Sequence, residues 1–238
     1  MTQILWLNEN EPEFPATQLA LSDPDGLLAA GGRLDVNWLT QAYSKGIFPW
    51  FNEGDPLLWW SPAPRMVLYP DQLRLNKTLK KHIRRTQDTQ ITFNQDFESV
   101  IFHCATRTNG EDTWITEDMI QAYVDAHDQG LAHSVELWQE GKLVGGMYGI
   151  AMGGVFFGES MFSKIQSASR FCLAALVRYQ PNLTMVDCQL ESAHVAALGA
   201  QLVNRHEFEQ HLKENITDPK VHLFNWDQHI NLENLLDD

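Results

Sequence analysis

The chain has 238 residues, of which 44% are hydrophobic, and it carries a formal net charge of −14 at pH 7. This length and apolar content suffice for a hydrophobic core, but no run approaches the roughly 18 apolar residues of a membrane helix, and residues 1–10 do not resemble a signal peptide. The negative charge argues against nonspecific binding to polyanions, and three separated cysteines without a C-x-x-C spacing indicate neither disulfides nor zinc, so we expect a soluble protein of the reduced cytoplasm.

Residues 1–62 are dense in Pro, Gly and Trp and predict a compact, turn-rich N-terminal unit. Asp35 is placed to cap a short helix that Gly46 closes. The aromatic segments 46–51 and 57–62 lie near prolines and are typical either of core packing or of a stacking platform for a ring such as a nucleobase. Two prolines, Pro62 and Pro64, interrupt any regular element, so we expect one domain over 1–62 and a second over 63–238.

A strongly basic helix is expected after a strand over 65–69. Asn76 is its predicted N-cap, and Leu79 and Ile83 form its apolar side. Six of the seventeen Lys and Arg residues of the chain fall in this short stretch: Arg74, Lys77, Lys80, Lys81, Arg84 and Arg85. Such a surface is either a solvated helix face or a binding site for phosphate groups.

The middle of the chain predicts two helices followed by a three-stranded meander. A short strand over 91–93 precedes a helix capped by Asp96, and Thr116 caps a second helix that stops at Gly130. Strands are expected over 135–138, 142–149 and 155–157. Glu159 then stands in an apolar run, where an unpaired carboxylate is costly to bury; it either has a partner or faces a cleft, or it lies in a solvated turn.

The last predicted elements are a helix and a strand. Ser163 and Gln166 have the spacing of a capping box for a helix that runs to Tyr179. In a strand over 184–190, alternation places Asp187 and Gln189 on the same face. Two such polar groups on a central strand are typical of a functional site, with a mutually hydrogen-bonded structural pair as the alternative. A short helix over 192–198 follows, and the remainder shows no chemistry that can be interpreted.

Taken together, these motifs resemble one known family. The segments 23–32, 42–43 with 46–51, 58–62 with Arg65, 113–116, 133–134 with 145–149, 158–163 and 187–189 look like leucyl/phenylalanyl-tRNA–protein transferase, in the order of that family. The resemblance implies an α+β protein in which a small N-terminal α/β domain precedes a GNAT-like acyltransferase domain, a mixed sheet flanked by helices. It also implies transfer of Leu or Phe, and less readily Met, from aminoacyl-tRNA to the α-amino group of proteins that begin with Arg or Lys. The product would be marked for degradation by the N-degron pathway.

The resemblance also implies roles for particular residues. Asp187 would accept a proton from the attacking amine, Gln189 would orient the ester or the amine, and Glu159 would support this cluster or attract the cationic acceptor. The amino-acid pocket would be formed by Met147, Phe156, Met161, Leu173, Leu176 and Val186. Trp50, Trp114, Tyr43 and Tyr123 would hold the terminal adenosine of the tRNA, and the basic helix would take its phosphates. The family implies no metal or coenzyme, and we expect a monomer.

Two other functions remain as alternatives. An acyl-CoA-dependent N-acetyltransferase would share the fold, but residues 163–169 contain none of the glycines that let a loop approach a diphosphate. A tRNA-binding adaptor without catalysis would use the basic helix and the aromatic residues, and its Asp187 and Gln189 would be structural.

Overall fold

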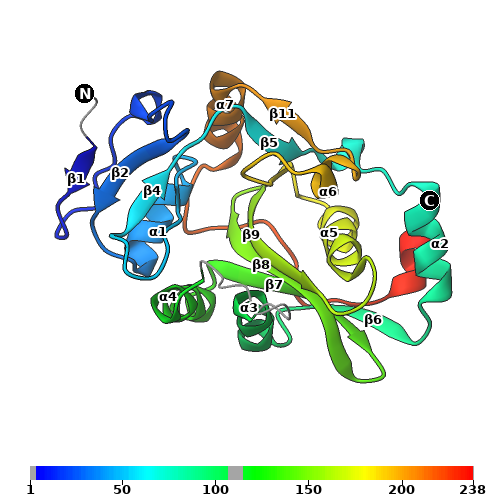
Figure 1. Cartoon of the computed structure of the whole chain (residues 1–238). Helices are drawn as coiled ribbons and strands as arrows, with labels where there is room; N and C mark the ends of the chain where they lie inside the picture. Colours follow the sequence, from blue (N-terminus) through cyan, green and yellow to red (C-terminus); the bar gives the residue numbers. More distant parts are fainter. Residues whose placement is uncertain (1–3, 107–114, 238) are drawn as a thin grey trace.

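The structure is a computed structural model that describes residues 4–106 and 115–237. Two β-sheets of unequal size stand side by side, and helices cover both faces of the larger one (Figure 1). Among the described residues, no helix combines the length and apolarity that a membrane crossing requires.

The small sheet has four strands in the order β1-β2-β4-β3. Its strands are β1 (Leu5–Leu7), β2 (Leu27–Gly31), β3 (Phe48–Pro49) and β4 (Leu58–Trp60). Helix α1 (Val36–Tyr43) begins as expected at Asp35, whose carboxylate accepts a hydrogen bond from the Trp38 amide. Trp38 stacks on Trp59 with ring centroids 6.0 Å apart, so much of the aromatic content here forms core.

The large sheet has eight strands in the order β11-β5-β10-β9-β8-β7-β6-β12. Its strands are β5 (Arg65–Leu68), β6 (Thr89–Phe93), β7 (Ala132–Gln139), β8 (Lys142–Met152), β9 (Val155–Ser163), β10 (Met185–Asp187), β11 (Gln201–Val203) and β12 (His229–Asn231). Only β9 and β10 pair in parallel, and all other neighbours in this sheet are antiparallel. The architecture is therefore mixed, in agreement with the coarse expectation of an α+β protein.

Six further helices accompany this sheet in the described part of the chain. They are α2 (Lys77–Arg85), α3 (Phe97–Ala105), α4 (Glu117–Asp128), α5 (Ala168–Tyr179), α6 (Ala193–Ala196) and α7 (Arg205–Asn215). Three short 3-10 segments cover Thr17–Leu19, Pro70–Gln72 and Leu232–Leu236. The predicted N-caps Asn76, Asp96 and Thr116 are confirmed, since each side chain accepts a hydrogen bond from the amide three residues ahead.

The alternation of side chains along β8 divides the core into two clusters. Met147 and Ala151 belong to the cluster that includes α5, whereas Tyr148 and Ile150 belong to the cluster that includes α3 and α4. Because successive residues of a strand point to opposite faces, the two clusters lie on the two faces of the large sheet. Figure 1 shows α5 on one side of β7, β8 and β9, with α3 and α4 on the other.

Two predicted elements near the end of the meander are wrong. Residues 158–163 continue β9 rather than follow it, and the predicted capping box is wrong because α5 begins at Ala168, after Ser167 with φ of 72°. Ser163 Oγ nevertheless accepts a hydrogen bond at 2.9 Å from the Ser169 backbone amide in the first turn of α5. The strand expected over 184–190 ends at Asp187, because Gln189 takes the left-handed conformation with φ of 62°. A residue in that conformation cannot continue the pleat, so the expected alternation stops there.

Candidate active site

A fork between two parallel strands forms the candidate site. β10 pairs with β9 only over the three positions from Val155 to Phe157, and β9 then runs on to Ser163 with β8 as its sole partner strand. The strands separate beyond this point, and a cavity of about 310 Å³ lies in the opening. It is lined by Met147, Gly158, Glu159, Ser160, Met161, Leu173, Val186, Asp187, Cys188, Gln189, Ser192, His194 and Val195. The three expected catalytic residues therefore border one cavity.

Four of the six residues expected to form the amino-acid pocket line this cavity. Met147, Met161, Leu173 and Val186 line the cavity, whereas Phe156 and Leu176 do not. Those two side chains are fully buried in the cluster that includes α5, where they fill core space instead of bordering an opening. Sequence reasoning did not identify Ser192 and His194, which supply a polar side to the same cavity.

A β-bulge directs Glu159 to this place. Tyr148 on β8 lies opposite Ser160, and the next residue, Gly149, lies opposite Gly158, so Glu159 is the extra residue of β9. A bulge of this kind turns one side chain out of the regular alternation of the strand. Gly149 permits the close approach there, because a Cβ at this position would lie 2.1 Å from the Phe157 carbonyl oxygen. The alternative that Glu159 lies in a solvated turn is wrong, since Glu159 is a buried residue of β9.

Neutral donors surround the Glu159 carboxylate. Tyr123 Oη donates to Oε2 at 2.8 Å, and Gln189 Nε2 donates to Oε1 at 2.6 Å. Tyr43 Oη lies 2.5 Å from Tyr123 Oη and extends the network. Burial raises the pKa of Glu159 to about 7, since desolvation disfavours the charged form more than the tyrosine hydrogen bonds favour it. A carboxyl group with such a pKa exchanges protons readily near neutral pH.

Asp187 has a different environment, dominated by a cation. Arg65 on β5 donates from Nε to Oδ1 and from Nη2 to Oδ2, both at 2.9 Å, and both side chains are fully buried. The backbone N–H of Gln189 also donates to Asp187 Oδ1 at 2.8 Å, and this hydrogen bond stabilises the left-handed turn at Gln189. The expected proton-accepting oxygens of Asp187 are thus already engaged by charge-assisted hydrogen bonds.

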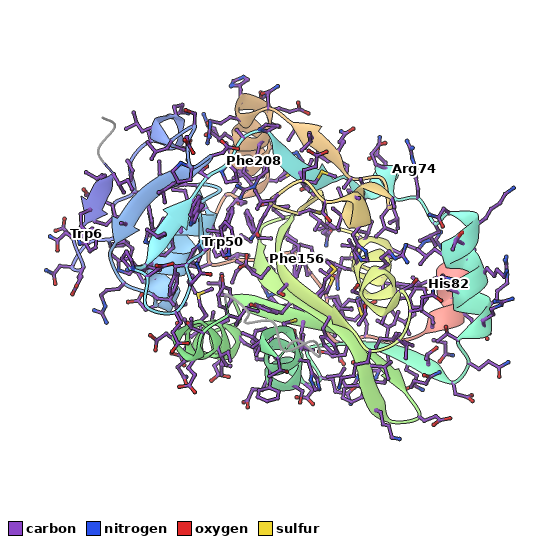
Figure 2. The ribbon with its side chains drawn as sticks, in the orientation of Figure 1. Trp6, Trp50, Arg74, His82, Phe156 and Phe208 are labelled. Carbon is purple, nitrogen blue, oxygen red and sulfur yellow. The ribbon has the colours of Figure 1, made fainter. Side chains whose placement is uncertain are left out.

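Several elements hold Arg65 in place. Its guanidinium carbon lies 4.8 Å from the ring centroids of both Phe48 and Phe208, and its Nη2 also donates to the Gly46 carbonyl oxygen at 3.1 Å. Phe48 belongs to the small sheet and Phe208 to α7, as Figure 2 shows for the latter. A cation between two ring faces is favourable, and burial strengthens it. Sequence reasoning did not single out Arg65 as a site residue, although a lone Arg in an otherwise apolar strand is a usable signal.

The residues expected to hold the terminal adenosine do not form one group. Tyr43 and Tyr123 are fully buried and present no exposed ring face, so base stacking on them is ruled out in this arrangement. Trp50 is 38% exposed, and its ring centroid lies 5.3 Å from that of Trp60. Trp114 lies outside the described residues.

The basic residues form a separate surface. Leu79 and Ile83 are buried as expected, and Lys77, Lys81, Arg84 and Arg85 of α2 are exposed, with Lys80 half-buried. Arg74 is exposed just before the helix, and its amide donates to the Leu198 carbonyl oxygen. In Figure 1, α2 lies at the opposite end of the molecule from the small sheet, with α5 between it and β9.

A second cavity, of about 620 Å³, lies between β6, the turn after β7 and the 3-10 segment Leu232–Leu236, and none of the expected site residues lines it. In the part of the chain that the structure describes, no group of three or more His, Cys, Asp or Glu side chains could hold a metal ion.

Comparisons with known proteins identify the family. The family model "Leucyl/phenylalanyl-tRNA protein transferase" matches residues 67–213, and the model of its N-terminal domain matches residues 32–63. The chain belongs to this family. A transferase of this name from Pseudomonas fluorescens is 48% identical over 219 residues, which cover 91% of this chain and 96% of that one. One from Hydrogenovibrio crunogenus is 50% identical over 216 residues, covering 89% and 84%.

A more distant relative and a solved structure complete the comparison. The Chromobacterium violaceum protein of the same name is 46% identical over 229 residues, covering 95% of this chain and 97% of that one. Among solved structures, a conserved protein of unknown function from Bacteroides thetaiotaomicron matches with a TM-score of 0.45 and 15% identity, covering 59% of this chain and 57% of that one. That likeness is too low to assign a fold.

The pKa of Glu159 is directly measurable. We expect ¹³C NMR of labelled glutamate to show a carboxyl group titrating near pH 7. Tyr123→Phe removes a donor to the carboxylate and raises this pKa further, by roughly one unit. The matched control is Tyr148→Phe, because Tyr148 Oη is buried and has no hydrogen-bond partner among residues 4–106 and 115–237. Equal titration in both variants would contradict the network described here.

The buried ion pair predicts a large stability difference. Arg65→Met leaves the Asp187 carboxylate buried without its cation, and we expect the free energy of unfolding to fall by about 3–5 kcal/mol. Urea denaturation measures it. The control is Arg33→Met, since Arg33 pairs with Asp35 at 3.6 Å with side chains 63% and 38% exposed, and we expect a change under about 1 kcal/mol. A similar small loss in both variants would show that the Arg65 pair does not anchor the fold.

Proposed function

We propose that the chain transfers leucine or phenylalanine, and less readily methionine, from aminoacyl-tRNA to the α-amino group of proteins that begin with Arg or Lys. Membership of the transferase family supports the reaction class. The single structural observation that carries the site is the cavity in the β9–β10 fork, where an apolar wall meets Glu159 and Gln189. A product with a new N-terminal Leu or Phe would enter the N-degron pathway.

The chemistry requires little beyond positioning and proton transfer. The ester of an aminoacyl-tRNA is already activated, so the neutral amine attacks its carbonyl carbon, the C–N bond forms and the C–O bond to the ribose breaks. The amine loses one proton, and the departing ribose oxygen takes one up. Glu159 is suited to accept and return this proton, because its pKa of about 7 matches neutral conditions. No metal or coenzyme takes part in this scheme.

The proposed roles of Asp187 and Gln189 follow from their partners. The Arg65 guanidinium donates hydrogen bonds to the Asp187 carboxylate, which also accepts one from the backbone N–H of Gln189. The side-chain Nε2 of Gln189 in turn donates to the Glu159 carboxylate. We assign Asp187 to positioning and Gln189 to orienting Glu159 and the ester. This differs from the resemblance, in which Asp187 is the proton acceptor.

Four cavity residues are proposed to bind the donor side chain. Met147, Met161, Leu173 and Val186 form an apolar wall, and flexible methionines suit a pocket that accepts several shapes. Trp50 keeps its proposed role as the stacking partner of the terminal adenine, because its ring is partly exposed. Arg74 and the basic residues of α2 are proposed to bind acceptor-stem phosphates.

We also propose a division of the chain into a small domain over 1–62 and a GNAT-like domain over 63–238, acting as a monomer in the cytoplasm. The separate four-stranded and eight-stranded sheets support the division. The fork between two parallel strands, with a cavity in its opening, supports the likeness to acyltransferases of that type.

The decisive experiment mixes the purified chain with leucyl-tRNA and a peptide that starts with Arg. We expect the peptide mass to increase by one leucine residue, and the same peptide starting with Ala to stay unchanged. Glu159→Gln should reduce the rate about 10²–10⁴-fold while tRNA binding persists. Binding without any mass change would favour the adaptor, and acetylation of the peptide by acetyl-CoA would favour the N-acetyltransferase.

Donor choice is open to a specific test at Gly158. A Cβ added there lies 3.5 Å from the Asp187 carbonyl oxygen and 4.0 Å from Met147 Cε, both ordinary contacts, and it narrows the cavity. We expect Gly158→Ala to lower phenylalanine transfer relative to leucine by about tenfold, measured as the ratio of kcat/KM values. Gly149→Ala is the contrasting variant, because its clash with the Phe157 carbonyl oxygen should lower stability without changing that ratio. An unchanged ratio in Gly158→Ala would remove this cavity from donor selection.

A further inference from the structure

A line of basic and hydroxyl side chains leads away from the cavity along α6 and α5. His194 of α6 lines the cavity, and its Nε2 lies 3.3 Å from Ser169 Oγ in the first turn of α5. Arg170 is the next residue of α5. Burial lowers the pKa of His194, and the positive charge of Arg170 lowers it further. Because Ser169 contacts His194 and directly precedes Arg170 in the first turn of α5, His194 and Arg170 lie in the same part of the molecule.

The same line continues to α2. Arg170 Nη2 donates to Ser167 Oγ at 2.7 Å, and His82 Nδ1 lies 2.8 Å from that oxygen. His82 belongs to α2, which is labelled at His82 in Figure 2, and its contact with Ser167 brings it beside the residue that precedes α5. Ser167 thus connects a cation beside the cavity to the helix that carries the exposed lysines and arginines.

In the part of the chain that the structure describes, the cations along this line form no ion pair. Within residues 4–106 and 115–237, no carboxylate lies within 4.0 Å of a charged nitrogen of Arg170 or of the basic side chains of α2. The Nε of Arg170 is buried and has no hydrogen-bond partner among the same residues. The chain has a net charge of −14, so it does not attract anions over its whole surface. A row of cations without acidic partners makes the field locally positive, and an anionic ligand is attracted to that place.

We propose that Arg170, flanked by His194 and His82, binds the phosphodiester backbone of the single-stranded 3′ end of the donor RNA between the cavity and α2. The inference rests on the proposed function, which places the ester in the cavity and the acceptor-stem phosphates at α2. The strand that joins those two points carries one negative charge per nucleotide. Arg170 offers guanidinium hydrogen bonds that suit phosphate oxygens, and such contacts position RNA without reading its bases.

The test uses leucine donors of three lengths. They are the leucyl ester of adenosine, which carries no phosphate, the leucyl ester of the trinucleotide CCA, and leucyl-tRNA. We expect Arg170→Gln to raise KM about tenfold for the trinucleotide and for leucyl-tRNA and to leave KM for the adenosine ester unchanged. Lys81→Gln, on α2, should raise KM for leucyl-tRNA alone.

Two further variants separate charge from structure. Arg170→Lys keeps the cation and should retain most of the affinity for the trinucleotide, whereas Lys213→Gln removes an exposed cation from α7 and should change no KM. An equal rise in KM for all three donors in Arg170→Gln, or no rise for the trinucleotide, would overturn the inference. Failure of the unmodified chain to transfer leucine from any donor would instead overturn the proposed function.

Discussion

The buried pair between Arg65 and Asp187 is the interaction on which the rest of the site depends. It joins β5 to the end of β10, and the two phenylalanines that enclose the guanidinium come from the small sheet and from α7. Burying two charges is expensive unless the geometry is good and the remaining hydrogen bonds are made. Here both carboxylate oxygens are engaged, and the Gln189 amide uses one of them. The turn that carries Gln189 is therefore anchored to three separate parts of the molecule.

This anchoring explains how two carboxylates in one cavity can have different properties. Asp187 is balanced by a full positive charge, whereas the hydrogen-bond donors to Glu159 among the described residues are neutral tyrosine and glutamine groups. Neutral donors stabilise a carboxylate less than a guanidinium does, so burial dominates at Glu159 and its pKa rises to about 7. Two carboxyl groups that border one cavity thus have different environments, and such a difference is a recurring way to assign different roles to a pair of acids.

The sequence predicted those features that depend on neighbouring residues. Asp35, Asn76, Asp96 and Thr116 cap helices as expected, because a cap needs only a short side chain three residues before an amide. The partner of Asp187 could not be derived in this way, since Arg65 lies 122 positions earlier. Tyr43 and Tyr123 were expected to hold the terminal adenosine and are instead buried, where the Tyr123 hydroxyl donates to Glu159 on β9 and the Tyr43 hydroxyl contacts that of Tyr123. Which apolar residues border the cavity depends on where β9 and β10 separate, and this excluded Phe156 and Leu176.

The acidity of the chain and its proposed RNA ligand are compatible because charge acts locally. At physiological ionic strength the field of an exposed charge decays within about 8 Å, so distant acidic residues do not cancel the cations of α2 and α5. The surplus of negative charge on the rest of the surface disfavours binding of RNA anywhere else. The net charge of −14 and a local cluster of cations can therefore occur in the same molecule without contradiction.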